Sequence, residues 1–182
     1  MLILASGSPR RKELLSLITD EFEVLVSGCD EFIPEGTPAE KVPAILAEQK
    51  ALAVAKLRPE DTVIGSDTVV VLNGEIFGKP KSKEHAHAML RALSGKKHFV
   101  YTGVAVAEKG EVRSFVQKTE VEFYELSDET IDKYIETLEP MDKAGAYGIQ
   151  GKGSVLVKGI VGDYFNVMGL PVAETARFLG FV

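Results

Sequence analysis

Hydrophobic and polar positions along the chain divide it into segments of two kinds. Segments that follow capping residues and carry periodic apolar positions predict helices over 9–18, 38–57, 83–94 and 128–138, and a last helix that ends at residue 179. Alternating or β-branched runs predict strands over 22–26, 62–72, 75–78, 98–107, 111–125 and 154–161, after an apolar run at 2–5. Helices alternate with single strands and with hairpins, so we expect an α/β fold with a mixed twisted sheet and flanking helices.

Cap signals set several of these boundaries. The segment 37–40 reads as a capping box with proline at the first helical position, so it predicts the start of the second helix. Ser82 and Ser127 are typical N-cap residues before the next two helices. Gly180 is a typical residue for the end of the last one.

The first helix begins with an unusual charge. Ser8 and Pro9 read as its N-cap and first residue, directly after an apolar run and a small-residue loop. A helix N-terminus is electropositive and favours acidic side chains, yet Arg10, Arg11 and Lys12 occupy this first turn. Free backbone N–H groups, small hydroxyl side chains and two guanidinium groups are good ligands for a phosphate. We therefore expect an anionic ligand here.

The pair Asn73-Gly74 is a strong signal for a two-residue hairpin. Its register places Val70 opposite Phe77 and Thr68 opposite Lys79. Lys79 is thereby brought close to the middle of the preceding strand. It is either a site residue or a solvated lysine at a sheet edge.

Asp67 is the most informative acidic residue. It lies within a strand that is apolar on both sides, where a carboxylate without a partner is costly. Either backbone N–H groups at a strand end satisfy it, or it faces a cleft as a general base or metal ligand, which we favour. Strict alternation places Lys79 on the Thr68 face, so its direct contact with Asp67 requires a bulge or twist.

A glycine-rich stretch over 142–153 allows the backbone to approach a ligand closely. Within it, Tyr147 offers a ring and Gln150 an amide, which suit a nucleobase, although a plain turn-rich loop is the alternative. Asp163 lies in a similar turn, as a second carboxylate or as an Asx-turn residue. Glu31 and Lys50 alone are equally well explained by exposure to solvent.

Composition and charge limit the classes of protein to which the chain can belong. The 182 residues are 45% hydrophobic and carry a net charge of -6, which predicts one globular unit over 1–182 and speaks against nucleic-acid or membrane-surface binding. No apolar segment is long enough for a signal peptide or a membrane span, so we expect a cytoplasmic protein. The single cysteine, Cys29, excludes an internal disulfide, and we interpret it as a small semi-buried residue. The three histidines lack metal-ligand spacing.

Several of these pieces also occur, in the same order, in one protein family. The pieces are 5–11, 30–31, Lys50, 65–69, 78–80, 139–151 and 162–171. Together they resemble the Maf family, whose members are described as septum-formation inhibitors and as nucleoside triphosphate pyrophosphatases. Each piece alone is a weak pattern, and their joint occurrence is highly specific.

The resemblance implies a fold like that of inosine triphosphate pyrophosphatases, with two lobes around a cleft, and commonly a homodimer. It implies hydrolysis of a nucleoside triphosphate to the monophosphate and pyrophosphate with a divalent cation, Mg²⁺ or Mn²⁺. The implied roles are phosphate binding by Ser6, Arg11, Lys50 and Lys79, proton acceptance by Asp67, and metal or water assistance by Glu31 together with Asp67.

Substrate choice within the family is carried by three positions, which here are Arg10, Thr68 and Gln150. This trio resembles the dTTP/UTP subfamily, whereas the 7-methyl-GTP subfamily carries tryptophan, glutamine and glutamate. Modified pyrimidine nucleotides fit the same description. The main rival is a nucleotide-binding regulator of septum formation and cell division that does not hydrolyse its ligand. A carboxylate such as Asp67 in an apolar strand favours hydrolysis, since a sensor has little need of it.

Overall fold

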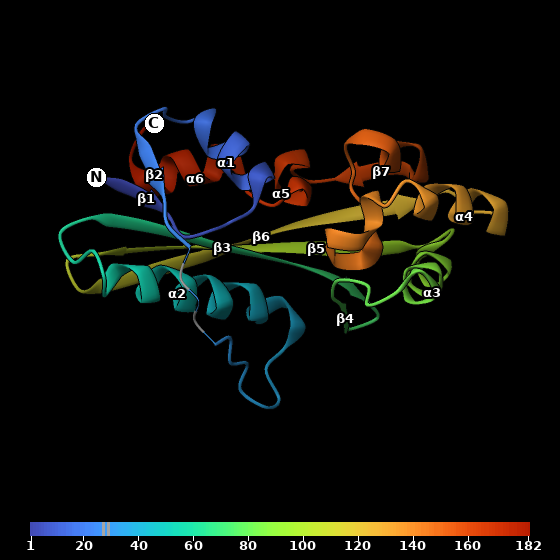
Figure 1. Cartoon of the computed structure of the whole chain (residues 1–182), viewed down its shortest axis with the longest axis horizontal. Helices are drawn as coiled ribbons and strands as arrows, with labels where there is room; N and C mark the ends of the chain where they lie inside the picture. The colour runs from blue at the N-terminus through green and yellow to red at the C-terminus, as the bar shows by residue number, and fades with distance from the viewer. Residues whose placement is uncertain (27, 29) are drawn as a thin grey trace.

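The computed structural model describes residues 1–26, 28 and 30–182, so the expectation for Cys29 lies outside the described residues (Figure 1). Over this part of the chain, one seven-stranded sheet has the order β2-β1-β3-β5-β6-β7, and β4 also pairs with β3. β1 is parallel to β2 and β3, and the other pairs are antiparallel, so the sheet is mixed as predicted. The strands are β1 (Leu2–Leu4), β2 (Phe22–Val24), β3 (Thr62–Leu72), β4 (Glu75–Phe77), β5 (Lys97–Glu108), β6 (Glu111–Phe123) and β7 (Val157–Val161).

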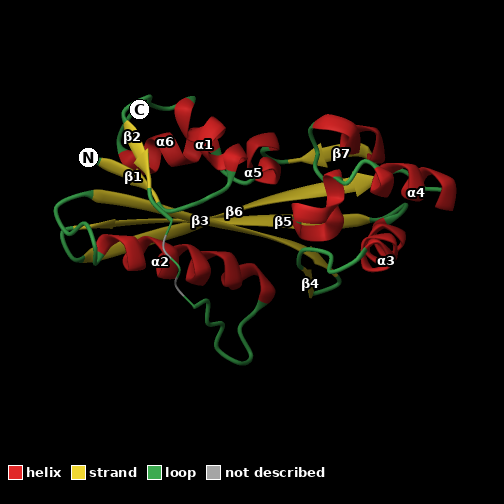
Figure 2. Ribbon diagram, in the orientation of Figure 1, coloured by secondary structure: helices red, strands yellow, loops and turns green. Residues whose placement is uncertain are grey.

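Helices cover both faces of this long sheet (Figure 2). At one end of the molecule, α2 lies on one face and α1, α5 and α6 lie on the other. α3 and α4 pack against each other at the opposite end. Within the described residues, no helix is both long and apolar enough to span a membrane. The helices are α1 (Pro9–Ser16), α2 (Val42–Ala55), α3 (Lys83–Leu93), α4 (Asp128–Glu136), α5 (Tyr164–Met168) and α6 (Val172–Leu179), with 3₁₀ turns η1 (Ala39–Lys41), η2 (Glu139–Asp142), η3 (Ala144–Ala146) and η4 (Gly151–Leu156).

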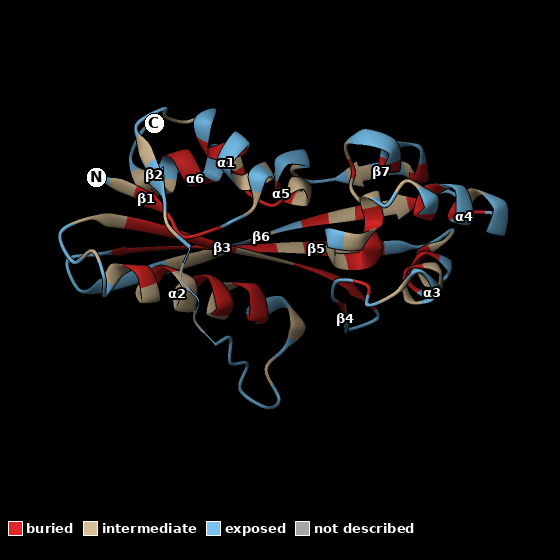
Figure 3. Cartoon of the chain, in the orientation of Figure 1, coloured by how far each residue is buried: buried red, intermediate tan, exposed pale blue. Residues whose placement is uncertain are grey.

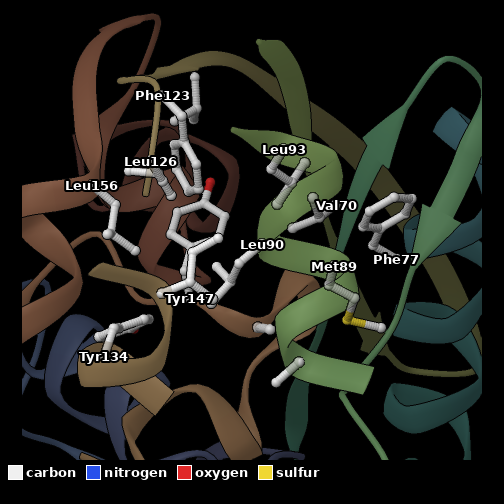
Figure 4. Packing of buried hydrophobic residues seen from close by; sticks show 14 of the residues in the cluster. Val70, Phe77, Met89, Leu90, Leu93, Phe123, Leu126, Tyr134, Tyr147 and Leu156 are labelled. Carbon is white, nitrogen blue, oxygen red and sulfur yellow. The ribbon is translucent and has the colours of Figure 1, made fainter. Parts of the chain in front are cut away.

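The hydrophobic core is divided between the two ends of the sheet, which form the two lobes. The largest cluster packs α3 and α4 against the sheet and includes Leu90, Phe123 and Ile131 (Figure 4). At the other end, smaller clusters pack α2 on one face and α1 with α6 on the other. β3, β5 and β6 run through both lobes. β3 and β5 are buried over most of their length, whereas β6 is buried only near its C-terminal end, at Thr119, Val121 and Phe123 (Figure 3).

Two glycines allow α2 to lie directly on the sheet. A Cβ atom added at Gly65 would lie 2.3 Å from the carbonyl oxygen of Ala47, and one added at Gly103 would lie 2.3 Å from the carbonyl group of Pro43. Real Cβ atoms do not approach backbone so closely. This close contact brings Lys50, on the same helix, to the middle of β3.

Most of the predicted caps are present. Ser8, Ser82 and Ser127 each accept a hydrogen bond from a backbone N–H in the first turn of α1, α3 and α4. Gly180 ends α6 with a φ of 81°, in the left-handed region that glycine tolerates.

Three local predictions differ from the structure. The capping box at Thr37 does not form, because the Thr37 hydroxyl donates to the carbonyl oxygen of Pro34 (2.6 Å) and α2 begins only at Val42, after η1. The last strand begins at Val157 rather than 154, because the residues before it form η4. The short helix α5 was not predicted. Asp163 caps it and accepts from the backbone N–H of Phe165 (2.7 Å), two residues further on, so the Asx-turn alternative for Asp163 is confirmed.

Candidate active site

The candidate site lies where one edge of β3 is open. On that edge, β1 pairs with β3 only as far as Ile64, and β4 pairs with it only from Val70. Among the described residues, the segment 65–69 between them has no strand partner on this edge. Asp67 points to the α2 face and Thr68 to the α1 face, yet both reach the same cleft of about 450 Å³.

This cleft brings the predicted residues together. It is lined by Arg10, Arg11, Glu31, Lys50, Asp67, Thr68, Lys79 and Gln150, and Ser6 lines an adjoining hollow. The residues come from both lobes, because the N-terminal loop lies on one side of the cleft and the glycine-rich stretch on the other.

Three acceptors hold the side chain of Arg11. Its guanidinium donates to the carbonyl oxygen of Gly169 (2.9 Å), to the hydroxyl of Thr68 (3.0 Å) and to the hydroxyl of Ser6 (3.4 Å). Burial lowers the pKa of Arg11, and the nearby carboxylate of Asp67 offsets part of this effect. The guanidinium stays protonated, because arginine side chains do not lose their proton in folded proteins. Arg11 is therefore a fixed positive charge at the cleft.

A lysine bridges the two candidate metal ligands. The ammonium of Lys50 lies 2.5 Å from a carboxylate oxygen of Asp67 and 3.0 Å from one of Glu31. The Asp67 side chain is 15% exposed and that of Lys50 is 18% exposed, so little water screens this pair. Among the described residues, Asp67 is thus paired with Lys50 of α2 and with no backbone N–H group, and it faces the cleft.

Asp142 and Lys143 also line the cleft, and the sequence had not identified either as a site residue. Asp142 accepts from Lys143 (2.8 Å) and pairs with Arg10 (3.5 Å). Partial burial alone would raise the pKa of Asp142, but these cations outweigh it and keep the pKa below its ordinary value. The only signal in the sequence was their place at the start of the glycine-rich stretch.

Within that stretch, the predicted roles of Tyr147 and Gln150 separate. Tyr147 lines the cleft, but it is 5% exposed and packs edge-on against Phe123 (Figure 4) and against His98, so little of its ring is open to a ligand. Its hydroxyl and the Nε2 atom of His98 lie 2.7 Å apart. Gln150 lines the cleft, and its Oε1 atom is buried without a hydrogen-bond partner in the described chain. An oxygen of this kind is suited to accept from a ligand.

Lys79 reaches the cleft by another route than the one predicted. The hairpin has the predicted register at Val70 and Phe77, but β4 ends there, so the pairing of Lys79 with Thr68 does not form. Lys79 lines the cleft as an exposed residue of the loop after β4. No bulge is needed to bring it to the Asp67 side, because the edge of β3 is open between the two strands.

The charge of the cleft is opposite to that of the whole chain. Five cationic side chains line it against three carboxylates, whereas the chain has a net charge of -6. The cations are Arg10, Arg11, Lys50, Lys79 and Lys143. Such a cluster favours a small, highly charged anion, of which a polyphosphate is the best example.

The chain is similar to proteins of known name over nearly its whole length. The chain is 54% identical over 178 residues to a dTTP/UTP pyrophosphatase of Bacillus cytotoxicus, covering 97% of this chain and 93% of that protein. It is 54% identical over 176 residues to a dTTP/UTP pyrophosphatase of Geobacillus sp., with coverage of 97% and 95%. Two solved structures are more distant. The Ham1 protein of Staphylococcus aureus has 22% identity and a TM-score of 0.47 over 67% of this chain and 71% of that one.

The second solved structure is a nucleoside-triphosphatase / dITP/XTP pyrophosphatase of Mycobacterium abscessus, with 14% identity and a TM-score of 0.48 over 99% of this chain and 97% of that one. The model of one sequence family, described as Maf-like protein, matches residues 1–181. The match covers nearly the whole chain, and the chain therefore belongs to the Maf family.

Proposed function

We propose that this protein is a nucleoside triphosphate pyrophosphatase that hydrolyses dTTP and UTP to the monophosphate and pyrophosphate. The observation that carries the proposal is Asp67 at the open edge of β3, a carboxylate inside a cleft in which cationic side chains outnumber carboxylates. The names of the relatives, dTTP/UTP pyrophosphatases at 54% identity, support the same reaction and the same substrates.

The phosphates are bound by the cations of the cleft in this proposal. A nucleoside triphosphate carries about four negative charges, and the charge on the leaving pyrophosphate grows as the bond to the α-phosphorus breaks. Arg11 with Ser6 provides rigid donors at the N-terminal loop. Lys50 and Lys79 supply ammonium groups from other parts of the cleft lining.

The carboxylates of Glu31 and Asp67 fit a divalent cation. Both point at one ammonium ion, so their oxygens already share a position for positive charge. Mg²⁺ and Mn²⁺ prefer oxygen ligands, and Mg²⁺ usually binds through one or two carboxylates together with substrate phosphates. When bound, such a cation would neutralise phosphate charge and polarise the phosphorus–oxygen bond. Lys50 would then be released from the carboxylates to contact phosphate oxygens.

Asp67 takes the proton of the attacking water. Its carboxylate projects into the cleft from the strand β3, so it can orient a water toward the α-phosphorus without a movement of the backbone. Proton transfer to a positioned carboxylate contributes typically 10²- to 10⁴-fold to a rate. Glu31, at the rim with a side chain that is 49% exposed, assists by holding the water or the cation.

The base is selected by Arg10, Thr68 and Gln150. The Thr68 hydroxyl is shared with Arg11 and with Thr102 (2.9 Å), so it links the phosphate side of the cleft to its floor. The unpartnered Oε1 atom of Gln150 is an acceptor for the N3–H donor of uracil or thymine. Modified pyrimidines that keep this N3–H group would be accepted by the same contact.

The rival function is a regulator of cell division that binds a nucleotide without hydrolysing it. Both functions need the cationic cleft, and only hydrolysis needs Asp67 as a base. Release of pyrophosphate from a panel of nucleoside triphosphates, with Mg²⁺ or Mn²⁺ added, separates the two. Rapid release from dTTP and UTP supports the enzyme, and binding without release from any triphosphate supports the regulator.

We further propose that residues 1–182 fold as one unit and that the protein is a cytoplasmic homodimer. The continuous strands β3, β5 and β6 support the single unit, since neither lobe has a sheet of its own. The dimer follows from the family resemblance and is tested by light scattering of the purified protein. Fractionation of cells tests the location.

A further inference from the structure

Two side chains outside the cleft hold the loop that carries Gln150. Glu139 lies in η2, and one oxygen of its carboxylate accepts from the backbone N–H of Gly153 (2.9 Å). The other oxygen accepts from the N–H of Lys152 (3.0 Å). The turn that follows Gln150 is therefore tied to a single carboxylate.

Tyr134, in α4, completes this arrangement on the other side of Gln150. Its hydroxyl donates to the carboxylate of Glu139 (3.0 Å) and accepts from the backbone N–H of Gly148 (3.0 Å). The backbone N–H groups of Gly148, Lys152 and Gly153, which lie on both sides of Gln150, thus converge on one hydroxyl and one carboxylate. We call this pair, Tyr134 and Glu139, the loop clamp.

The glycines of this loop leave room for the clamp. A Cβ atom added at Gly153 would lie 2.7 Å from the Tyr134 hydroxyl, and one added at Gly151 would lie 2.9 Å from the Glu139 carboxylate. Gly151 also has a φ of 71°, which disfavours other residues. The glycine spacing in the sequence therefore serves the approach of the loop to the clamp, in addition to any approach of a ligand.

The loop clamp contains a charged carboxylate. Burial alone would raise the pKa of Glu139, but the N–H groups of Lys152 and Gly153 and the Tyr134 hydroxyl outweigh it, and the pKa lies below its ordinary value. The carboxylate is thus ionised at neutral pH, and hydrogen bonds to a charged acceptor are the stronger kind. Tyr134 is 4% exposed, so its ring is fixed by the core.

Neither clamp residue lines the cleft, so the clamp acts on a ligand only through the loop. The Oε1 atom of Gln150 has no partner of its own in the described chain, and its direction therefore depends on the backbone that carries it. We infer that Tyr134 and Glu139 are positioning residues that aim the Gln150 amide, and that they thereby set the preference for uracil and thymine over cytosine. This inference rests on the proposed pyrophosphatase function.

The test compares kcat and KM for UTP and CTP in four variants. Tyr134→Phe and Glu139→Gln weaken the clamp with little change of shape. Tyr124→Phe and Glu136→Gln are matched controls, since both side chains are exposed, at 52% for Tyr124 and 70% for Glu136. The two clamp variants should lose about five- to tenfold of the UTP preference in kcat/KM, the value of one or two hydrogen bonds. The loss should lie mainly in KM, and both controls should keep the preference.

Two other outcomes separate a failure of the proposed function from a failure of this inference. If the unmodified protein releases no pyrophosphate from any triphosphate, the proposed function fails and this inference fails with it. If it prefers UTP and both clamp variants keep that preference, or lose kcat equally for both nucleotides, the proposed function stands and the inference is overturned.

Amide hydrogen exchange gives a readout that does not depend on activity and needs only Tyr134→Phe. Exchange at Gly148, Lys152 and Gly153 should become faster in this variant, while exchange in β5 should stay unchanged. Faster exchange along the whole chain, or no change at the three glycine-loop amides, would show that the hydroxyl does not hold the loop and would overturn the inference.

Discussion

The ammonium of Lys50 and the carboxylate of Asp67 are in direct contact, at 2.5 Å, across the space between α2 and the open edge of β3. The contact depends on the two glycines that let α2 lie on the sheet. Since Lys50 also contacts Glu31, one cation of the chain occupies the position where the two carboxylates would hold a metal ion. Lys50 and a bound metal ion would therefore compete for the same oxygens.

Lys50→Met tests this competition. Removal of the ammonium leaves two carboxylates without a cation, so Mn²⁺ should bind about tenfold more tightly in the absence of nucleotide, as measured by electron paramagnetic resonance. KM for UTP should rise about tenfold or more, because a phosphate contact is lost, which corresponds to about 1.4 kcal/mol. Lys56→Met, at the exposed end of α2, is the control. Unchanged Mn²⁺ binding would contradict the competition.

Gln150→Glu tests selection of the base. The carboxylate keeps an acceptor but adds negative charge and removes the amide donor, so both kcat/KM values, for dTTP and for UTP, should fall about tenfold or more. The midpoint of thermal unfolding should change little, since the Gln150 side chain makes no hydrogen bond through its Oε1 atom in the described chain. Unchanged kinetics with all pyrimidine nucleotides would remove Gln150 from the specificity role.

Gly103→Ala tests the contact between α2 and the sheet. The new methyl group meets the backbone of Pro43 at 2.3 Å, so α2 must move away, at a cost of about 3 kcal/mol and roughly 10 °C in the unfolding midpoint. Hydrolysis should fall as well, because Lys50 moves with the helix. Gly159→Ala in β7 is the matched control, since an added Cβ atom has nothing within 4 Å. Equal stability of the two variants would show that the contact is not tight.

His98 makes stability depend on pH. Burial lowers the pKa of His98 to about 4, whereas a histidine in the unfolded chain has a pKa of about 6.5. Between these values the unfolded state binds more protons, so stability falls as the pH drops from 6.5 towards 4. The loss between pH 7.5 and pH 5 should be about 2 kcal/mol in urea unfolding. His98→Gln should reduce that loss, and an equal loss in this variant would assign it to other groups.

Local features were predictable from the sequence because they depend on neighbouring residues. The hairpin at Asn73-Gly74 has the predicted register, and both turn residues have positive φ, as a two-residue turn of this type requires. The N-caps at Ser8, Ser82 and Ser127 are present for the same reason. Thr37 is the exception, because its hydroxyl has a competing acceptor in the preceding turn.

The arrangement of the site was predictable only in part. The sequence identified Asp67 as a carboxylate that needs a partner, but its partner Lys50 lies 17 residues away on a helix whose distance from the sheet is set by Gly65 and Gly103. The open edge of β3 depends on where β1 and β4 stop pairing, which no single segment encodes. The burial of the Tyr147 ring was not predictable for a similar reason, since its aromatic partners come from distant strands.

The most direct test of the account is the release of pyrophosphate from UTP by the unmodified protein and by Asp67→Asn, with Mg²⁺ present. The asparagine keeps the size of the side chain and loses the proton acceptor, so turnover should fall by at least about 10²- to 10⁴-fold. Binding of UTP, measured by calorimetry, should remain largely intact, because Arg11, Lys79 and Ser6 are unchanged. Near-normal release of pyrophosphate by Asp67→Asn would contradict the central role of Asp67 in hydrolysis.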